Sequence, residues 1–160
     1  MQLASGAAAV LATFATAAGV GIADVPTASA DNYPVQQNFG AQERLNDAGG
    51  AVITGWTVSN LHPSDDPIPY QPHGKLWEAT ATVKAIRGTV TPLVADFNAR
   101  AANGQNYPEL GNVATAQGVN PASVPQGQET TGKLYFDVVG PNPNKVVYNA
   151  GGRDLLVWTG

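Results

Sequence analysis

The chain has 160 residues, enough for one domain with a hydrophobic core, and charged residues make up only 12% of it. Its net charge is −4 and its eight basic residues are scattered, which argues against a nucleic-acid-binding surface. It has no cysteine, which excludes disulfides, thiolate metal sites and a cysteine nucleophile. Eighteen glycines and twelve prolines indicate many turns and short strands.

Residues 1–30 have the pattern of a secretory signal peptide. An apolar, small-residue stretch over 6–22 is followed by an Ala-Ser-Ala motif at 28–30, which is typical of a cleavage site. The first five residues lack the usual positive charge, so either translation starts upstream or the terminal amine serves alone. An uncleaved anchor is the alternative, although Pro26 interrupts a weakly hydrophobic run. We expect cleavage after Ala30, a secreted domain over 31–160, and no stable membrane insertion.

The mature chain begins with segments of different character. Residues 31–40 predict an extended entry with a short edge strand, because Pro34 lacks a backbone donor. Residues 41–50 are polar and end in Gly-Gly, which predicts a turn, with a helical turn over 41–47 as the alternative. Residues 51–61 are rich in β-branched side chains and predict a strand.

Residues 62–74 contain four prolines and no apolar period, which predicts a loop. Its length suggests either a crossing from one sheet to another or a functional excursion.

The stretch KLWEATATVKAIRGTV, residues 75–90, fits two periodicities. With period 2, one face carries Trp77, Ala79, Ala81, Val83 and Ala85, as in a half-buried strand. With period 3.6, a helical stripe also forms, and several of these residues favour helices. The β-branched side chains and the lack of a good N-cap before Lys75 favour the strand.

The remaining chain continues the β pattern. Strand-like residues over 89–100 precede an Asn-Gly turn, and 111–132 are mostly loop. Residues 133–140 alternate cleanly, and 145–158 form a hairpin whose last strand is apolar on both faces and should be central. Seven to nine short strands predict an antiparallel β-sandwich. The three tryptophans are expected to converge in its core, which contains Trp56, Trp77, Val83, Phe97, Phe136, Val138, Leu156 and Trp158.

Four segments also resemble a known family. They are GWTVSNL, LWEATATVKAIRGTVTPLVADFNARAANGQNY, PQGQETTGKLYFDV and DLLVW, and the resemblance runs from about residue 33 to 158. In order and spacing they are similar to the small secreted immunogenic proteins of mycobacteria and their actinobacterial relatives. The resemblance implies an immunoglobulin-like antiparallel β-sandwich, an antigen, and no catalytic residues to carry over. The uncharged start and the polar segment 40–47 depart from the family, and the loop 62–74 is where relatives are expected to vary.

The loop holds the best candidate ligands for a divalent metal, which are His62, Asp65, Asp66 and His73. Their spacing matches no tight ligand motif, and an unstructured loop loses entropy when it closes on an ion. The alternative is a solvated turn in which the two aspartates cap backbone donors. We therefore predict neither a metal nor a cofactor.

Other candidate chemistry is weaker. A pair of carboxylates at suitable separation is the requirement for glycoside hydrolysis. The carboxylates in or beside different strands are more simply interpreted as exposed charges, paired loosely with Lys133, Arg100 or Arg153; they are Asp96, Glu109, Asp137 and Asp154. A serine triad is not indicated, because G-x-S-x-G is absent and the candidate serines lie in turn-like contexts; these are Ser59, Ser64 and Ser123.

Glu78, Thr80, Thr82 and Lys84 form a polar strip on one face of the 75–90 strand. It is interpreted as a solvated sheet face, with a recognition face or a strand-pairing edge as the alternative. The expected function is therefore binding, without catalysis, to a host, envelope or other protein partner of unknown identity. The alternatives are a carrier of a small molecule or lipid between the two sheets, and a metal-dependent hydrolase that uses the loop from His62 to His73.

Overall fold

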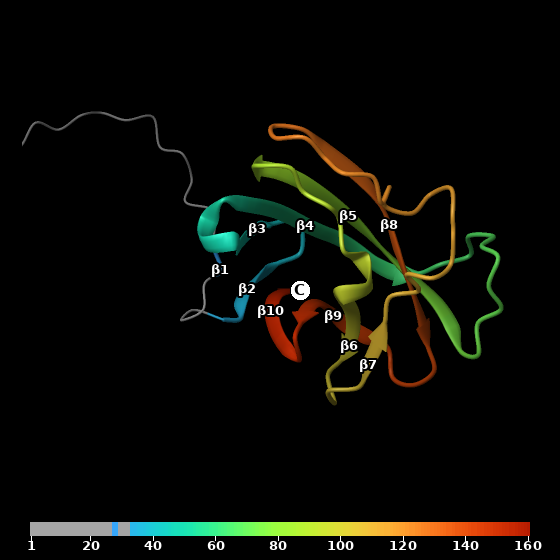
Figure 1. Cartoon of the computed structure of the whole chain (residues 1–160). Helices are drawn as coiled ribbons and strands as arrows, with labels where there is room; N and C mark the ends of the chain where they lie inside the picture. Colours follow the sequence, from blue (N-terminus) through green and yellow to red (C-terminus); the bar gives the residue numbers. More distant parts are fainter. Residues whose placement is uncertain (1–26, 29–32) are drawn as a thin grey trace, which may run out of the picture.

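The structure, a computed structural model, describes residues 27–28 and 33–160. The expected signal segment and its cleavage site lie outside the described residues, apart from Thr27 and Ala28. Two five-stranded sheets face each other (Figure 1), in the orders β1-β3-β4-β5-β8 and β2-β10-β9-β6-β7. The expected all-β, immunoglobulin-like sandwich is confirmed.

The strands have the following bounds. The first sheet contains β1 (Thr27–Ala28), β3 (Gln42–Asp47), β4 (Val52–Pro63), β5 (Lys75–Arg87) and β8 (Glu129–Val138). The second contains β2 (Val35–Asn38), β10 (Arg153–Thr159), β9 (Pro143–Ala150), β6 (Phe97–Ala101) and β7 (Asn106–Pro108). Two short 3₁₀ turns, η1 (Ala48–Gly50) and η2 (Val94–Asp96), complete the described elements, and neither is long enough to cross a membrane. The pairing is antiparallel except between β1 and β3 and between β2 and β10.

The ambiguous stretch forms the central strand β5, which pairs with β4 on one side and β8 on the other. Ala79, Ala81 and Val83 are fully buried between the sheets, whereas Thr80 and Thr82 alternate with them on the outer face. Period 2 therefore prevails over the helical stripe, because only a strand satisfies the backbone groups of both neighbouring strands.

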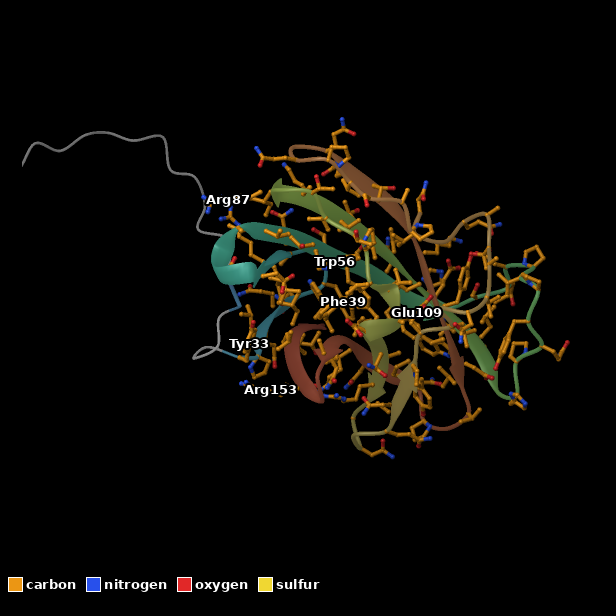
Figure 2. All side chains as sticks on the ribbon, viewed as in Figure 1. Tyr33, Phe39, Trp56, Arg87, Glu109 and Arg153 are labelled. Atoms are coloured by element: carbon orange, nitrogen blue, oxygen red, sulfur yellow. The ribbon has the colours of Figure 1, made fainter. Side chains whose placement is uncertain are left out.

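The core lies between the inner faces of the two sheets, and every residue expected in it is buried. Phe97 lies against Trp56 with ring centroids 4.8 Å apart and against Trp158 at 6.0 Å. Trp77 belongs to the same core but is paired in register with Phe136, on β8. Close ring contacts thus fill the space around Trp56 (labelled in Figure 2), which is one part of the region between the sheets where the carrier alternative expects a ligand.

One expectation about connections was wrong, and one of two alternatives for another connection is excluded. Residues 42–47 form the strand β3 rather than a turn, because Glu43 and Leu45 alternate inward and are buried. The turn lies after this strand, where Gly49 and Gly50 adopt positive φ values of 66° and 88° that favour glycine. The loop after Pro63 does not cross between sheets either, since it joins the neighbouring antiparallel strands β4 and β5.

Candidate functional site

The Pro-rich segment Ser64–Gly74, called the cap loop below, lies at the end of the sandwich opposite η1 (Figure 1). Where it meets the outer face of β5 and β8, outward-facing side chains are unexpectedly buried. Leu76 is 7% exposed, Glu78 6% and Tyr135 only 2%. The cap loop is therefore a packed part of the fold, which corrects the interpretation of a solvated turn.

The first anchor of the cap loop is the carboxylate of Asp66. Its Oδ2 atom accepts hydrogen bonds from Lys133 Nζ at 2.5 Å and from the Tyr135 hydroxyl at 2.6 Å. These hydrogen bonds hold the pKa of Asp66 below its usual value, so the group is ionised at neutral pH. Both donors lie on β8, 67 and 69 residues from Asp66 in sequence.

The same ammonium joins Asp66 to a second carboxylate. Lys133 Nζ lies 2.6 Å from Glu78 Oε2, and Glu78 Oε1 lies 3.2 Å from His62 Nε2. The hydrogen bond to Asp66, followed by that to Glu78, raises the pKa of Lys133 above its usual value. Glu78 is thus a buried member of an ion-pair network, and its interpretation as part of a solvated strip was wrong. Thr80, Thr82 and Lys84 are partly exposed, as that interpretation expected.

The second anchor is Asp137, at the far end of the cap loop. Its carboxylate accepts hydrogen bonds from the Tyr70 hydroxyl at 2.8 Å and from the backbone N–H groups of His73 and Gly74, each at 2.9 Å. Burial raises the pKa of Asp137, but these hydrogen bonds lower it by more, so the net pKa is below its usual value. Gly74 is required here, because a Cβ atom would lie 2.0 Å from the carbonyl oxygen of Val138.

The candidate metal ligands do not converge. His62 contacts Glu78, Asp66 contacts Lys133, and His73 contacts Asp137 at 3.3 Å, while Asp65 is exposed. Within residues 27–28 and 33–160, no group of three or more potential ligands is arranged to hold a metal ion. The hydrolase alternative thus lacks the constellation on which it depended.

The other candidate carboxylates have different surroundings. Asp154 forms a bidentate ion pair with Arg100, with N···O distances of 2.6 and 3.0 Å. Arg100 was among the expected partners, but the pairing is tighter than the loose surface contact that the sequence suggests. This pairing lowers the pKa of Asp154. Asp137 and Glu109 are not loosely paired surface charges: the first anchors the cap loop, and the second lines a pocket described below.

Sequence reasoning missed the partners of Glu78 and Asp66 and the burial of Glu43. Glu43 is 0% exposed, and neither of its carboxylate oxygens has a hydrogen-bond partner among the described residues. Burial raises its pKa to about 8, against the opposing effect of the backbone amides of Val157 and Gln37. The alternation in this segment is a signal for a strand, since Glu43 and Leu45 share one face.

Comparison with known proteins places the chain among close relatives. Residues 34–158 match a family described as a domain of unknown function, DUF1942. The immunogenic proteins MPB63 of Mycobacterium bovis and MPT63 of Mycobacterium tuberculosis are each 49% identical over 127 residues, covering 79% of this chain and 80% of theirs. The crystal structure of MPT63, described as a secreted protein, matches with a TM-score of 0.76 at 48% identity, covering 80% of this chain and 98% of that chain. The chain belongs to the DUF1942 family, together with these mycobacterial immunogenic proteins.

Proposed function

We propose that this protein is a secreted, non-catalytic binding protein that contacts a protein partner through the cap loop. The observation that carries the proposal is that a long irregular loop is fixed at both ends by the anchors Asp66 and Asp137. A loop that is ordered before binding loses less conformational entropy on binding, so its contacts contribute more to affinity. The names of the relatives, which are immunogenic proteins, and the secreted MPT63 support a role outside the cell.

The cap loop presents a defined outward face. Its residues alternate between exposed and less exposed, as an extended chain lying on a surface does. The exposed members combine prolines with polar side chains and are Asp65, Pro67, Pro69, Gln71 and His73. Prolines restrict the backbone further, so this face suits recognition by shape and hydrogen bonding.

The charges of the anchors favour binding over catalysis. Asp66 and Asp137 both have pKa values below the usual range, so neither is matched to proton transfer near neutral pH. Both carboxylates are also engaged in the hydrogen bonds that hold the cap loop in place.

Site-specific photo-crosslinking tests the proposal. A photoreactive side chain at Gln71 is expected to capture a discrete species from envelope or host-cell-surface extracts, because Gln71 is exposed on the cap loop. The matched control carries the same group at Ala102, an exposed position between β6 and β7. The species must be absent from the control, be competed by unmodified protein at micromolar concentration, and diminish in Asp137→Asn. Capture that is equal from both positions, or no competed species at all, contradicts the proposal.

A further inference from the structure

A pocket of about 300 Å³ opens on the side of the sandwich where β7 and β8 lie next to each other. Its walls come from η2, from the segment that follows β7, and from β8, which contributes Lys133 and Tyr135. Figure 2 shows Glu109 on this side of the molecule, far from Tyr33 and Arg153 at the opposite end. The volume is at the lower end of the ~300–1,000 Å³ typical of small-molecule sites.

The wall that carries Glu109 is held by both sheets. The backbone N–H of Glu109 donates to the carbonyl of Phe97 in β6, and that of Leu110 donates to the carbonyl of Tyr135 in β8, each at 2.9 Å. Further along, Lys133 N–H donates to the carbonyl of Gln117 at 2.8 Å. The pocket is therefore formed by backbone that the fold fixes, rather than by free loop.

Glu109 is the only carboxylate among the residues that line the pocket. Its Oε2 atom is shielded from solvent, and it has no hydrogen-bond partner and no cation within ion-pair distance in the described part of the chain. Burial raises the pKa of Glu109 to about 7, partly offset by the backbone N–H of Tyr135. A largely buried carboxylate with no cation beside it is costly, so an ammonium group in the pocket would gain a charge-assisted hydrogen bond by pairing with the part of the Glu109 carboxylate that lines the pocket.

The other charges near the pocket also favour a cation over an anion. Lys133 lines the pocket, but its ammonium is already bound by Asp66 and Glu78. This cluster contains one cation and two carboxylates, so an anionic ligand would find no free positive charge. Apolar side chains supply much of the remaining wall, including Val94, Leu110 and Val119.

We propose that this pocket binds a small organic amine whose ammonium group pairs with Glu109 and whose short apolar part contacts Val94, Leu110 and Val119. The site is separate from the outward face of the cap loop, and the proposal does not depend on the function suggested for that loop. The charge of the ligand follows from Glu109, the one carboxylate in the lining of this pocket, and the size of the ligand follows from the pocket volume.

Two-dimensional ¹⁵N NMR titration of the full chain at pH 8 tests the proposal with three probes of similar shape. Benzylamine carries the ammonium, benzyl alcohol is its neutral counterpart and benzoate carries the opposite charge. Benzylamine is expected to shift saturably the amides of residues 109–119 and 133–135 and to bind at least ~10-fold more tightly than the other two, as one charge-assisted hydrogen bond implies.

Variants separate the pocket from the general surface charge. Glu109→Gln keeps the shape and is expected to weaken benzylamine binding ~10-fold, whereas Glu129→Gln removes an exposed carboxylate of β8 outside this pocket and should leave it unchanged. The proposal is overturned if benzylamine does not saturate, if benzyl alcohol or benzoate binds equally well, or if Glu109→Gln binds like the native protein. The comparison of probes on the native protein decides the matter even if the variant fails to fold.

Discussion

Replacing Glu43 by glutamine tests the most unusual electrostatic feature of the core. Glu43 is completely buried where β3 faces β2 and β10, and its carboxylate oxygens lack partners among the residues described. Burial raises its pKa from 4.5 to about 8. The folded protein therefore keeps a proton on Glu43 between these values, while the unfolded chain releases it.

The sign and size of the effect follow from this difference. The contribution of protonated Glu43 to the free energy of unfolding is complete below pH 4.5 and is lost progressively as pH rises to about 8. At about 1.4 kcal/mol for each pH unit, the native protein loses about 4 kcal/mol between pH 5 and pH 8 through this group. Glu43→Gln has no such titration, so its stability relative to the native protein should rise by about that amount over the same range.

Urea denaturation followed by tryptophan fluorescence at pH 5, 6.5 and 8 measures the difference. Glu109 titrates in both proteins, so its contribution cancels in the comparison. Glu129→Gln is the control. Because Glu129 is exposed, the free energy of unfolding of this variant should differ from that of the native protein by an amount that is independent of pH. If the stabilities of Glu43→Gln and the native protein run parallel between pH 5 and pH 8, the assignment of a buried, protonated Glu43 is refuted.

Four further substitutions test the packing of β5 and the anchoring of the cap loop. Ala81→Leu adds volume at a fully buried position and should lower the free energy of unfolding by about 1–3 kcal/mol, whereas Thr82→Lys on the outer face should change it by less than about 0.5 kcal/mol; the opposite ranking in urea denaturation would reverse the face assignment. Lys133→Met leaves its two carboxylate partners facing each other and should cost about 1–3 kcal/mol, and equal or higher thermal stability would show that the ion pairs are dispensable. Gly74→Ala places a Cβ atom 2.0 Å from the carbonyl oxygen of Val138, so it should accelerate amide hydrogen exchange in the cap loop; unchanged exchange would contradict the close contact.

The pattern of neighbouring side chains was sufficient to predict much of the fold. In β5 the alternation of small apolar and polar side chains identifies both the strand and its inward face, because burial on one side of a sheet has period 2. The final strand was expected to be central from its two apolar faces, and β10 does lie between β2 and β9. In both cases a few neighbouring residues contain the whole signal.

The candidate site could not be predicted from the sequence in the same way, because it depends on partners far apart in sequence. The sequence around Asp66 suggests a turn residue, and nothing in it indicates that Lys133 will form an ion pair with Asp66 or that the Tyr135 hydroxyl will donate a hydrogen bond to it. Glu78 looked solvent-exposed because the cap loop that buries it is not part of the strand pattern. Glu43 was missed for a different reason, since a charged residue on an inward face argues against a strand on propensity alone.

The position of β10 has a consequence for how the protein acquires its structure. In the second sheet this strand lies between β2, which is near the start of the domain, and β9, so it joins residues more than a hundred positions apart. Before residues 153–159 have been synthesised, β2 has no neighbour in its sheet and β9 has an open edge. The second sheet therefore cannot be completed until residues 153–159 have been synthesised, and the large sequence separation between its paired strands is typical of slow folding.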